Sequence, residues 1–106
     1  MPQTVLSARE GRVAILTINR PDKLNGLDPA MFEALVETGT ALGRDRSLRA
    51  VVLSGEGRAF CAGLDFAAFM AGGGLGGGEH PLFAREPGSP ANRAQRAAWV
   101  WSEVPV

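Results

Sequence analysis

Apolar residues near the start of the chain form two strand-like runs, residues 4–9 and residues 13–19. Glu10, Gly11 and Arg12 separate the runs and suit a hairpin turn, because glycine adopts turn conformations readily. The second run is apolar on both alternating faces, a pattern typical of a strand that is covered on both sides. Pro21 ends this run, since proline has no amide to donate to a sheet. The pattern predicts a β-hairpin whose second strand is buried.

A helix is predicted to begin at Asp28 and Pro29, which combine an N-cap carboxylate with proline at the first helical position. Gly39 is expected to weaken the middle of this helix and Gly43 to end it. Residues 48–54 form another buried strand-like run. The apolar face of the helix consists of Met31, Phe32, Leu35, Val36 and Leu42. The order strand, strand, helix, strand predicts an α/β fold.

The second half of the chain is less regular. Asp65 suits the N-cap of a short helix whose buried side would carry Phe66, Phe69 and Met70. Residues 72–90 are rich in glycine and proline, and we interpret them as a mobile surface loop within one domain that spans residues 1–106. Residues 91–103 follow a serine and a proline and are predicted to form a helix. Its packing residues would be Ala94, Ala98, Trp99 and residues 101–104.

Composition narrows the classes of partner. The 106 residues include 11 Lys and Arg and 11 Asp and Glu, so no basic stripe recruits nucleic acid or an anionic membrane. The sequence has no apolar run long enough to span a bilayer, and its first residues lack the pattern of a signal peptide. The single Cys61 cannot form an internal disulfide. A small cytoplasmic domain is therefore expected, without nucleic acid or membrane as partner.

Several residues have both a chemical and a structural interpretation. Cys61 has no histidine near it in sequence to activate it as a nucleophile, so a small buried thiol is favoured. His80 is expected to be solvated, and Glu33 and Glu37 to line the polar edge of a helix. Trp99 and Trp101 would be core or interface residues more readily than a docking surface. The pair Gly55 and Gly57 lacks the third glycine of a nucleotide-binding loop.

Two segments together resemble the enoyl-CoA hydratase/isomerase (crotonase) family. Residues 19–28 read NRPDKLNGLD and are similar to the family signature of N-R-P, a spacer and N-A-L, with Gly26 at the usual alanine. Residues 55–66 read GEGRAFCAGLDF and are similar to its G-x-G-x-A-F-C-A-G-x-D-L block. The resemblance covers most of the chain. It implies an α/β fold of crotonase type, a spiral of β-β-α units, of which this chain would hold the opening turns.

The resemblance also implies a chemistry. Family members hold a coenzyme A thioester so that backbone amides contact its carbonyl oxygen, where negative charge grows in an enolate-like transition state. The first of these amides corresponds to Leu64. The residues agree with this role, because Gly63 permits a tight turn and Asp65 caps a helix whose first amides are free.

The resemblance places the coenzyme A thioester against specific positions in both motifs. Lys23 would reach a phosphate, and Phe66, Phe69 and Met70 would line an acyl tunnel. The remaining substrate-binding positions implied are Leu24, Gly26, Ala62, Gly63 and Asp65. The resemblance implies no metal or redox cofactor, and full-length family members are expected to be homotrimers or homohexamers.

The family's second oxyanion amide and its acid/base carboxylates have no counterpart in residues 1–106. We therefore expect a truncated chain that is inactive alone and marginally stable, with unpaired strand edges and an uncovered apolar face. A non-catalytic remnant that binds acyl-CoA weakly, or that associates with full-length relatives, is the alternative, and an active short enzyme is the least favoured. Hydratase, isomerase, thioester hydrolase and decarboxylase chemistry all stay open, as does the acyl chain length.

Overall fold

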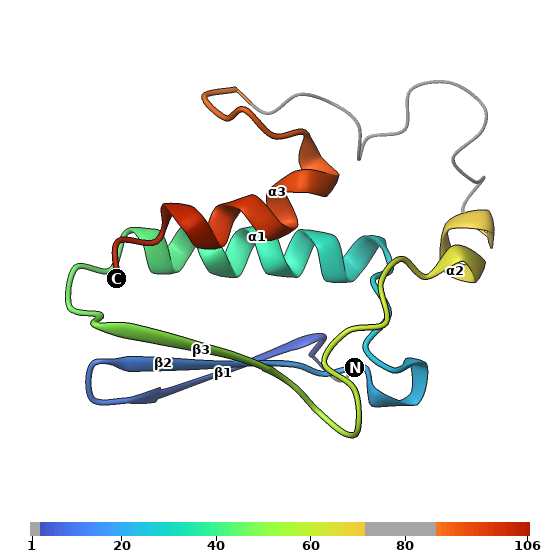
Figure 1. Ribbon diagram of the computed structural model, residues 1–106, viewed down its shortest axis with the longest axis horizontal. Helices are drawn as coiled ribbons and strands as arrows, with labels where there is room; N and C mark the ends of the chain where they lie inside the picture. Colours follow the sequence, from blue (N-terminus) through green and yellow to red (C-terminus); the bar gives the residue numbers. More distant parts are fainter. Residues whose placement is uncertain (1–2, 72–86) are drawn as a thin grey trace.

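A single three-stranded sheet forms the base of the molecule. The computed structural model describes residues 3–71 and 87–106, and its strands are β1 (Val5–Glu10), β2 (Val13–Ile18) and β3 (Ala50–Gly55). β2 lies in the centre, antiparallel to β1 and parallel to β3. The parallel connection from β2 to β3 passes through helix α1 (Pro29–Gly43), which crosses one face of the sheet (Figure 1). The predicted order of strand, strand, helix and strand is confirmed.

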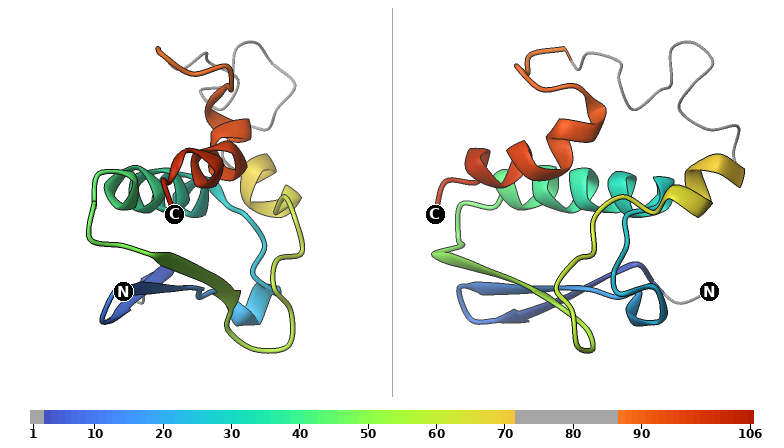
Figure 2. Two further views of the ribbon diagram at one scale, coloured as in Figure 1. Left: turned by 60° about the vertical axis from the view of Figure 1, so that its left-hand side comes forward. Right: turned by 45° about the vertical axis from the view of Figure 1, so that its right-hand side comes forward.

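The remaining helical segments are short. A 3-10 turn, η1 (Pro21–Lys23), follows β2, and α2 (Phe66–Ala71) follows the irregular segment after β3. α3 (Arg93–Trp99) continues into the 3-10 turn η3 (Val100–Glu103) and lies along α1. Figures 1 and 2 show α1, α2 and α3 on the same side of the sheet.

The core forms where α1 meets the sheet and the other helices. The apolar face of α1 supplies Met31, Phe32, Leu35 and Val36, all buried, as predicted from helical spacing. Ile18, Phe69 and Ala97 complete this cluster from β2, α2 and α3. The rings of Phe32 and Phe69 meet edge to face with centroids 5.9 Å apart, a favoured aromatic geometry. α1 and α2 are thereby joined through their side chains.

The opposite face of the sheet is open, which corrects the expectation that the second strand is covered on both sides. Ala14, Leu16 and Ile18 point toward the helices and are buried, whereas the alternate residues of β2 are only half-buried. β3 was also expected to be buried, but its Val52 is 48% exposed. The reason is that the helices of the described residues pack on one face alone.

The helix boundaries agree with the prediction for α1 and differ for α3. Asp28 caps α1 by accepting a hydrogen bond from the Met31 amide at 2.8 Å, with Pro29 at the first helical position. α3 begins at Arg93, not at residue 91. Asn92 is its N-cap, in a reciprocal capping box with Gln95. This box satisfies two amides at once, whereas Ser89 and the proline after it form a turn before the helix.

Residues 72–86 of the predicted loop, including His80, lie outside the described residues. None of the helices in the part of the chain that the structure describes has the length and apolar character needed to cross a membrane.

Candidate functional site

The two motif segments lie side by side after the ends of β2 and β3. Backbone hydrogen bonds join them in register: the Ala62 amide donates to the Leu24 carbonyl at 3.0 Å, and the Leu27 amide to the Gly63 carbonyl at 2.7 Å. The Asp65 amide then donates to the Leu27 carbonyl at 3.0 Å. Leu27 and Leu64 form an isolated parallel bridge. The fold thus brings together Leu24 and residues 62–65, which the sequence placed in one site.

The Leu64 amide points away from this bridge. The peptide bond between Gly63 and Leu64 is trans, so its C=O and N–H point in opposite directions. Because the Gly63 carbonyl accepts from Leu27, the N–H of Leu64 is directed to the other side. It makes no hydrogen bond within residues 3–71 and 87–106. Gly63 has a φ of +97°, a backbone conformation that residues other than glycine rarely adopt.

Asn25 fastens the first segment to the second, a role that the sequence analysis did not assign. Its side chain is fully buried. The Asn25 Nδ2 donates to the carbonyls of Glu56 at 3.0 Å and Ala59 at 2.7 Å. Its Oδ1 accepts from the Arg20 amide at 2.7 Å. The asparagine followed by a glycine in the first motif was a local signal for such a turn, because asparagine tolerates the φ of +59° seen here.

Gly55 permits this close approach. A Cβ atom at this position would lie 2.6 Å from the carbonyl oxygens of Ala59 and Phe60 and 2.8 Å from the Asn25 Nδ2. Gly57, with a φ of +83°, completes the turn after β3. The two glycines therefore serve the packing of one segment against the other.

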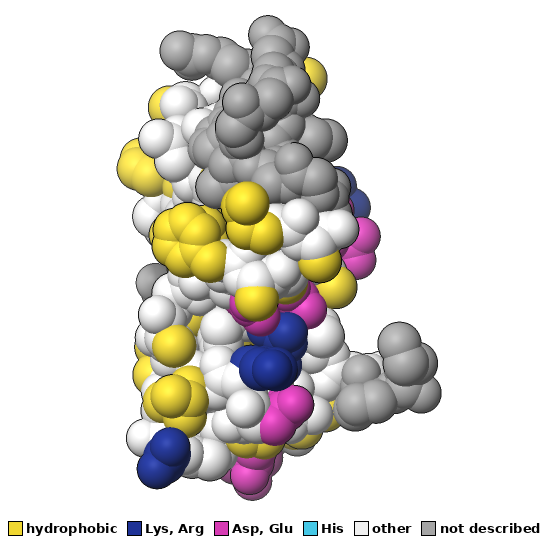
Figure 3. Space-filling view, turned by 90° about the vertical axis from the view of Figure 1, so that its right-hand side faces the viewer, with side chains coloured by type: hydrophobic (Ala, Val, Ile, Leu, Met, Phe, Trp, Pro, Cys, Tyr) yellow, Lys and Arg dark blue, Asp and Glu magenta, His cyan; other side chains and the backbone are white. Residues whose placement is uncertain are grey.

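Arg20 is a second residue whose role no local sequence pattern indicated. Its Nη1 donates to the Asp65 carboxylate at 2.7 Å and to the Gly26 carbonyl at 3.0 Å. Its Nε lies 3.4 Å from the Asp28 carboxylate. Figure 3, which views the end of the molecule that carries α2, shows basic and acidic side chains in contact on this face. The other oxygen of Asp65 accepts from the Ala68 amide at 3.1 Å and caps α2, as predicted.

The pKa of the Asp65 carboxyl is lowered by these partners. The Ala68 amide has the largest effect, followed by the hydrogen bond from Arg20, and the charge of Lys23 contributes least. Asp65 is therefore an anion whose oxygens already accept hydrogen bonds. This arrangement fits a structural cap and does not suit a group that exchanges protons with a ligand.

The other predicted substrate-binding residues are distributed around this core. Gly26 is buried, and a Cβ there would lie 3.2 Å from the Lys23 carbonyl oxygen, so the small residue fits a crowded turn. Lys23 lies in η1 and is exposed, and Leu24 is 38% exposed. Phe66 is 67% exposed at the start of α2. Exposed apolar side chains thus accompany the loop segments at this end of the molecule.

The three side chains expected to line an acyl tunnel do not lie together. Phe69 is buried in the core, whereas Phe66 and Met70 are exposed. Both were expected on the buried side of their helix. Because α2 has only six residues and meets the core through Phe69, most of its surface stays open.

A different apolar cavity of about 340 Å³ lies between the sheet, α1 and α3. Leu27 and Cys61 contribute to it, so it adjoins both motif segments. Cys61 is half-buried and packs against the core, in keeping with the small structural thiol that was favoured. The other lining residues are Ile18, Phe32, Leu35, Leu53, Phe60, Ala94, Ala97, Ala98 and Trp101.

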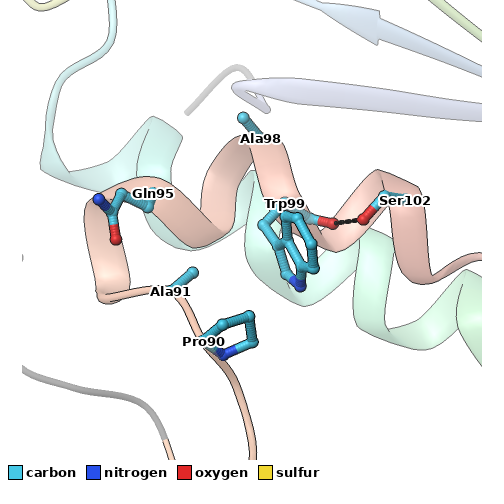
Figure 4. A pocket seen from close by; sticks show the side chains of 6 residues that line it. All are labelled: Pro90, Ala91, Gln95, Ala98, Trp99 and Ser102. Atoms are coloured by element: carbon cyan, nitrogen blue, oxygen red, sulfur yellow. Dashed lines mark hydrogen bonds between the residues drawn. The ribbon is translucent and has the colours of Figure 1, made fainter.

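A larger hollow of about 520 Å³ lies on the outer side of α3. Figure 4 shows the Trp99 indole extending from this helix on the side where Pro90 and Ala91 lie, with the Ser102 hydroxyl donating to the Trp99 carbonyl at 2.7 Å. None of the predicted site residues lines this hollow. Glu33, which could suggest a catalytic carboxylate, forms an ion pair with Arg93, also away from the motif segments.

Comparison with known proteins agrees with the geometry of the two segments. The family model described as "Enoyl-CoA hydratase/isomerase" matches residues 13–86. A protein of Rhizobium meliloti named "Probable enoyl-CoA hydratase" is 38% identical over 80% of this chain and 36% of its own length. The "3-hydroxyisobutyryl-CoA hydrolase 1" of Arabidopsis thaliana is 47% identical over 62% of this chain and 18% of its own.

A solved structure shows the same fold. The crystal structure of a probable enoyl-CoA hydratase/isomerase from Mycobacterium abscessus superposes with a TM-score of 0.65 and 36% identity, over 68% of this chain and 29% of that one. The chain thus spans about a third or less of the length of these relatives. It forms a small α/β part of the crotonase fold. With most of its length matched by the family model, the chain belongs to the enoyl-CoA hydratase/isomerase family.

Proposed function

We propose that this chain binds an acyl-CoA thioester and polarises its carbonyl group through the Leu64 amide. One observation carries the proposal: the amides of Ala62 and Asp65 are bonded to the first segment, whereas the Leu64 N–H between them is directed away from it. A thioester oxygen would accept this hydrogen bond. The choice of a CoA thioester as the ligand follows the names of the matched proteins, which include an enoyl-CoA hydratase and a 3-hydroxyisobutyryl-CoA hydrolase.

The physical advantage of such a donor is that it is fixed before the ligand arrives. When a thioester becomes enolate-like, negative charge grows on its oxygen, and an amide already directed there stabilises the transition state more than the ground state. The bridge between Leu27 and Leu64 holds the donor by hydrogen bonds of 2.7 and 3.0 Å on either side. α2 has six residues, so we assign the effect to the amide itself and not to a helix dipole.

The ligand would lie across both segments. Lys23 would contact a CoA phosphate, and Leu24, Ala62 and Phe66 would contact the coenzyme along this exposed end of the molecule, while the buried Gly26 would shape the turn next to Leu24. The acyl group would enter the apolar cavity of about 340 Å³ that Leu27 and Cys61 line. This cavity replaces the tunnel that was expected from Phe66, Phe69 and Met70.

Proton transfer is not part of the proposed role of these residues. Asp65 is the carboxylate next to Leu64, and its two oxygens accept from the Ala68 amide and from Arg20. We therefore expect the 106-residue chain to bind a thioester without turnover of crotonyl-CoA above background. The second candidate is a non-catalytic role, in which the chain binds acyl-CoA weakly or associates with longer relatives. The exposed apolar residues of the chain favour this role, Val52 and Phe60 among them.

The test uses nuclear magnetic resonance to follow backbone amides during titration with acetoacetyl-CoA or with free CoA. We expect the Leu64 amide resonance to shift with the thioester and to move little with free CoA, which has no carbonyl at this point. The Arg49 amide, which donates to the Arg12 carbonyl at 2.8 Å away from the motif segments, is the internal reference. Equal shifts of Leu64 with both ligands would contradict the proposal.

A matched pair of glycine variants tests the same donor. Gly63→Ala introduces a side chain at a φ of +97°, where there is no steric contact within 4 Å but the backbone conformation is strained by about 1–3 kcal/mol. Gly88→Ala is the control, because Gly88 has a φ of +75° and equally open surroundings. We expect Gly63→Ala to weaken acetoacetyl-CoA binding and Gly88→Ala to leave it unchanged. Equal effects of the two substitutions would argue against a special role for the peptide at Leu64.

A further inference from the structure

Arg20 connects three separate parts of the fold through one guanidinium group. Its Nη1 binds the Asp65 carboxylate and the Gly26 carbonyl at 2.7 and 3.0 Å, and its Nε faces the Asp28 carboxylate at 3.4 Å. Asp28 and Asp65 are the N-caps of α1 and α2, and each uses its other oxygen for its helix. The starts of both helices are therefore held by the same cation.

The burial of these groups makes their geometry restrictive. The side chains of Arg20, Asp28 and Asp65 are 19%, 21% and 14% exposed. At such partly desolvated positions, a charge that loses its partner costs more than it would on the open surface. Arginine also presents its donors in a rigid planar fork, so it fixes directions as well as neutralising charge. A lysine at this position would supply the charge without the fork.

The two residues that the Arg20 Nη1 binds, Gly26 and Asp65, are the neighbours in sequence of the residues whose bridge directs the Leu64 amide. Gly26 precedes Leu27 and Asp65 follows Leu64, and the bridge itself consists of Leu27 bonded to Gly63 and Asp65. None of the hydrogen bonds and ion pairs of Arg20 in the described residues is with Leu64. Because Gly26 and Asp65 adjoin the bridged residues, we expect a displacement of either one to disturb the peptide between Gly63 and Leu64.

We propose that Arg20 is a positioning residue for the thioester site, holding the Leu64 amide in direction by joining Gly26 and Asp65, the neighbours in sequence of the two bridged residues. This inference rests on the proposed function, since it assigns a second residue to the same site. It predicts that Arg20 matters for recognition of the thioester carbonyl and not for recognition of the coenzyme. The lowered pKa of the Asp65 carboxyl, caused first by Ala68 and then by Arg20, is consistent with a lasting contact.

The experiment uses calorimetry on the full chain to measure how strongly it prefers acetoacetyl-CoA to free CoA. The dissociation constants of free CoA and acetoacetyl-CoA are determined for the wild-type chain and for Arg20→Gln, and their ratio gives the preference for the thioester. We expect Arg20→Gln to lower this ratio about tenfold or more, because a misplacement of roughly 1 Å can abolish much of the effect of a fixed donor. The affinity for free CoA should stay unchanged.

Matched variants separate positioning from general stability. Arg9→Gln is the control, because Arg9 also bridges two partners, Asp45 and Ser47, each at 2.6 Å, at the end of the sheet opposite the motif segments. Asp65→Asn keeps an oxygen for the α2 cap but weakens the ion pair with Arg20. We expect it to lower the ratio in part, and the double variant with Arg20→Gln to lose no more than Arg20→Gln alone, since both act through one contact. Arg20→Lys should recover only part of the ratio.

The outcomes distinguish the two proposals. A wild-type chain that binds both ligands equally would overturn the proposed function, and this inference with it. A wild-type preference that survives in Arg20→Gln overturns the inference alone. A parallel loss of both affinities would also overturn it, because Arg20 would then be a phosphate ligand or a structural anchor. If Arg20→Gln does not fold, Asp65→Asn and Arg20→Lys give the same decision.

Discussion

Asn25 shows how one buried amide side chain can hold two loop segments together. Its three hydrogen bonds reach the Arg20 amide and the carbonyls of Glu56 and Ala59, and its own amide donates to the Arg20 carbonyl at 2.9 Å. A buried carbonyl that loses its donor keeps its desolvation cost. The register of Leu24 and Leu27 against residues 62–65 therefore depends on a residue that does not itself face the proposed ligand.

We predict that Asn25→Ala destabilises the chain by about 2–4 kcal/mol, because the substitution removes a fully buried side chain that bonds two carbonyls and one amide in part-buried contacts. The measurement is urea denaturation followed by circular dichroism. Asn19→Ala is the matched control: Asn19 donates to the Gln3 carbonyl at 3.0 Å in an exposed position, and we expect a loss of less than about 1 kcal/mol. A similar midpoint for Asn25→Ala and Asn19→Ala would show that the buried network does not hold the segments.

At the scale of the elements, the contact between α1 and η3 depends on Gly39. The sequence suggested only that this glycine weakens the helix, but in the structure it is buried against Val100. A Cβ atom at position 39 would lie 2.7 and 2.9 Å from the two Cγ atoms of Val100. The missing side chain thus sets how closely the C-terminal helical segments approach α1.

Gly39→Ala is predicted to destabilise the chain by about 1–3 kcal/mol, since overpacking against a stiff valine outweighs the gain of roughly 1 kcal/mol in helix propensity. Gly43→Ala is the control, because nothing lies within 4 Å of a Cβ there. We expect it to be neutral or slightly stabilising in thermal unfolding. Adding Val100→Ala to Gly39→Ala should relieve the clash, and a double variant less stable than both single variants would contradict this explanation.

The elements also show what the sequence could predict. α1 follows its local signals, because a capping aspartate, a proline and an apolar stripe all agree. α3 was placed two residues too early, since a serine before a proline competed with the capping box of Asn92 and Gln95. The ion pair between Arg20 and Asp65 joins residues 45 positions apart. No local pattern contains that pairing, so the motifs located the segments of the candidate site while its supporting contacts required the fold.

At the scale of the whole molecule, the open face of the sheet is the dominant feature. Leu6 and Val52 are 38% and 48% exposed, and Ile15 between them is half-buried. The register pairs Ile15 with Val52 and Thr17 with Leu6, which places all of these side chains on the face away from the helices. β1 and β3 are both edge strands of the described sheet. Apolar faces and free edges of this kind promote association between chains.

We therefore predict that the chain self-associates at micromolar to millimolar concentration and is only marginally stable as a monomer. Val52→Lys should reduce association, because a charge on an exposed strand opposes pairing with another sheet, while the core on the other face is unaffected. Val106→Lys is the matched control, since Val106 is 57% exposed and lies outside the sheet. Sedimentation velocity over a concentration series measures the association, and calorimetry measures the thermal stability. A wild-type chain that stays monomeric over the whole series would contradict the prediction. Equal effects of the two lysine substitutions would mean that added charge, and not the open sheet face, controls the association.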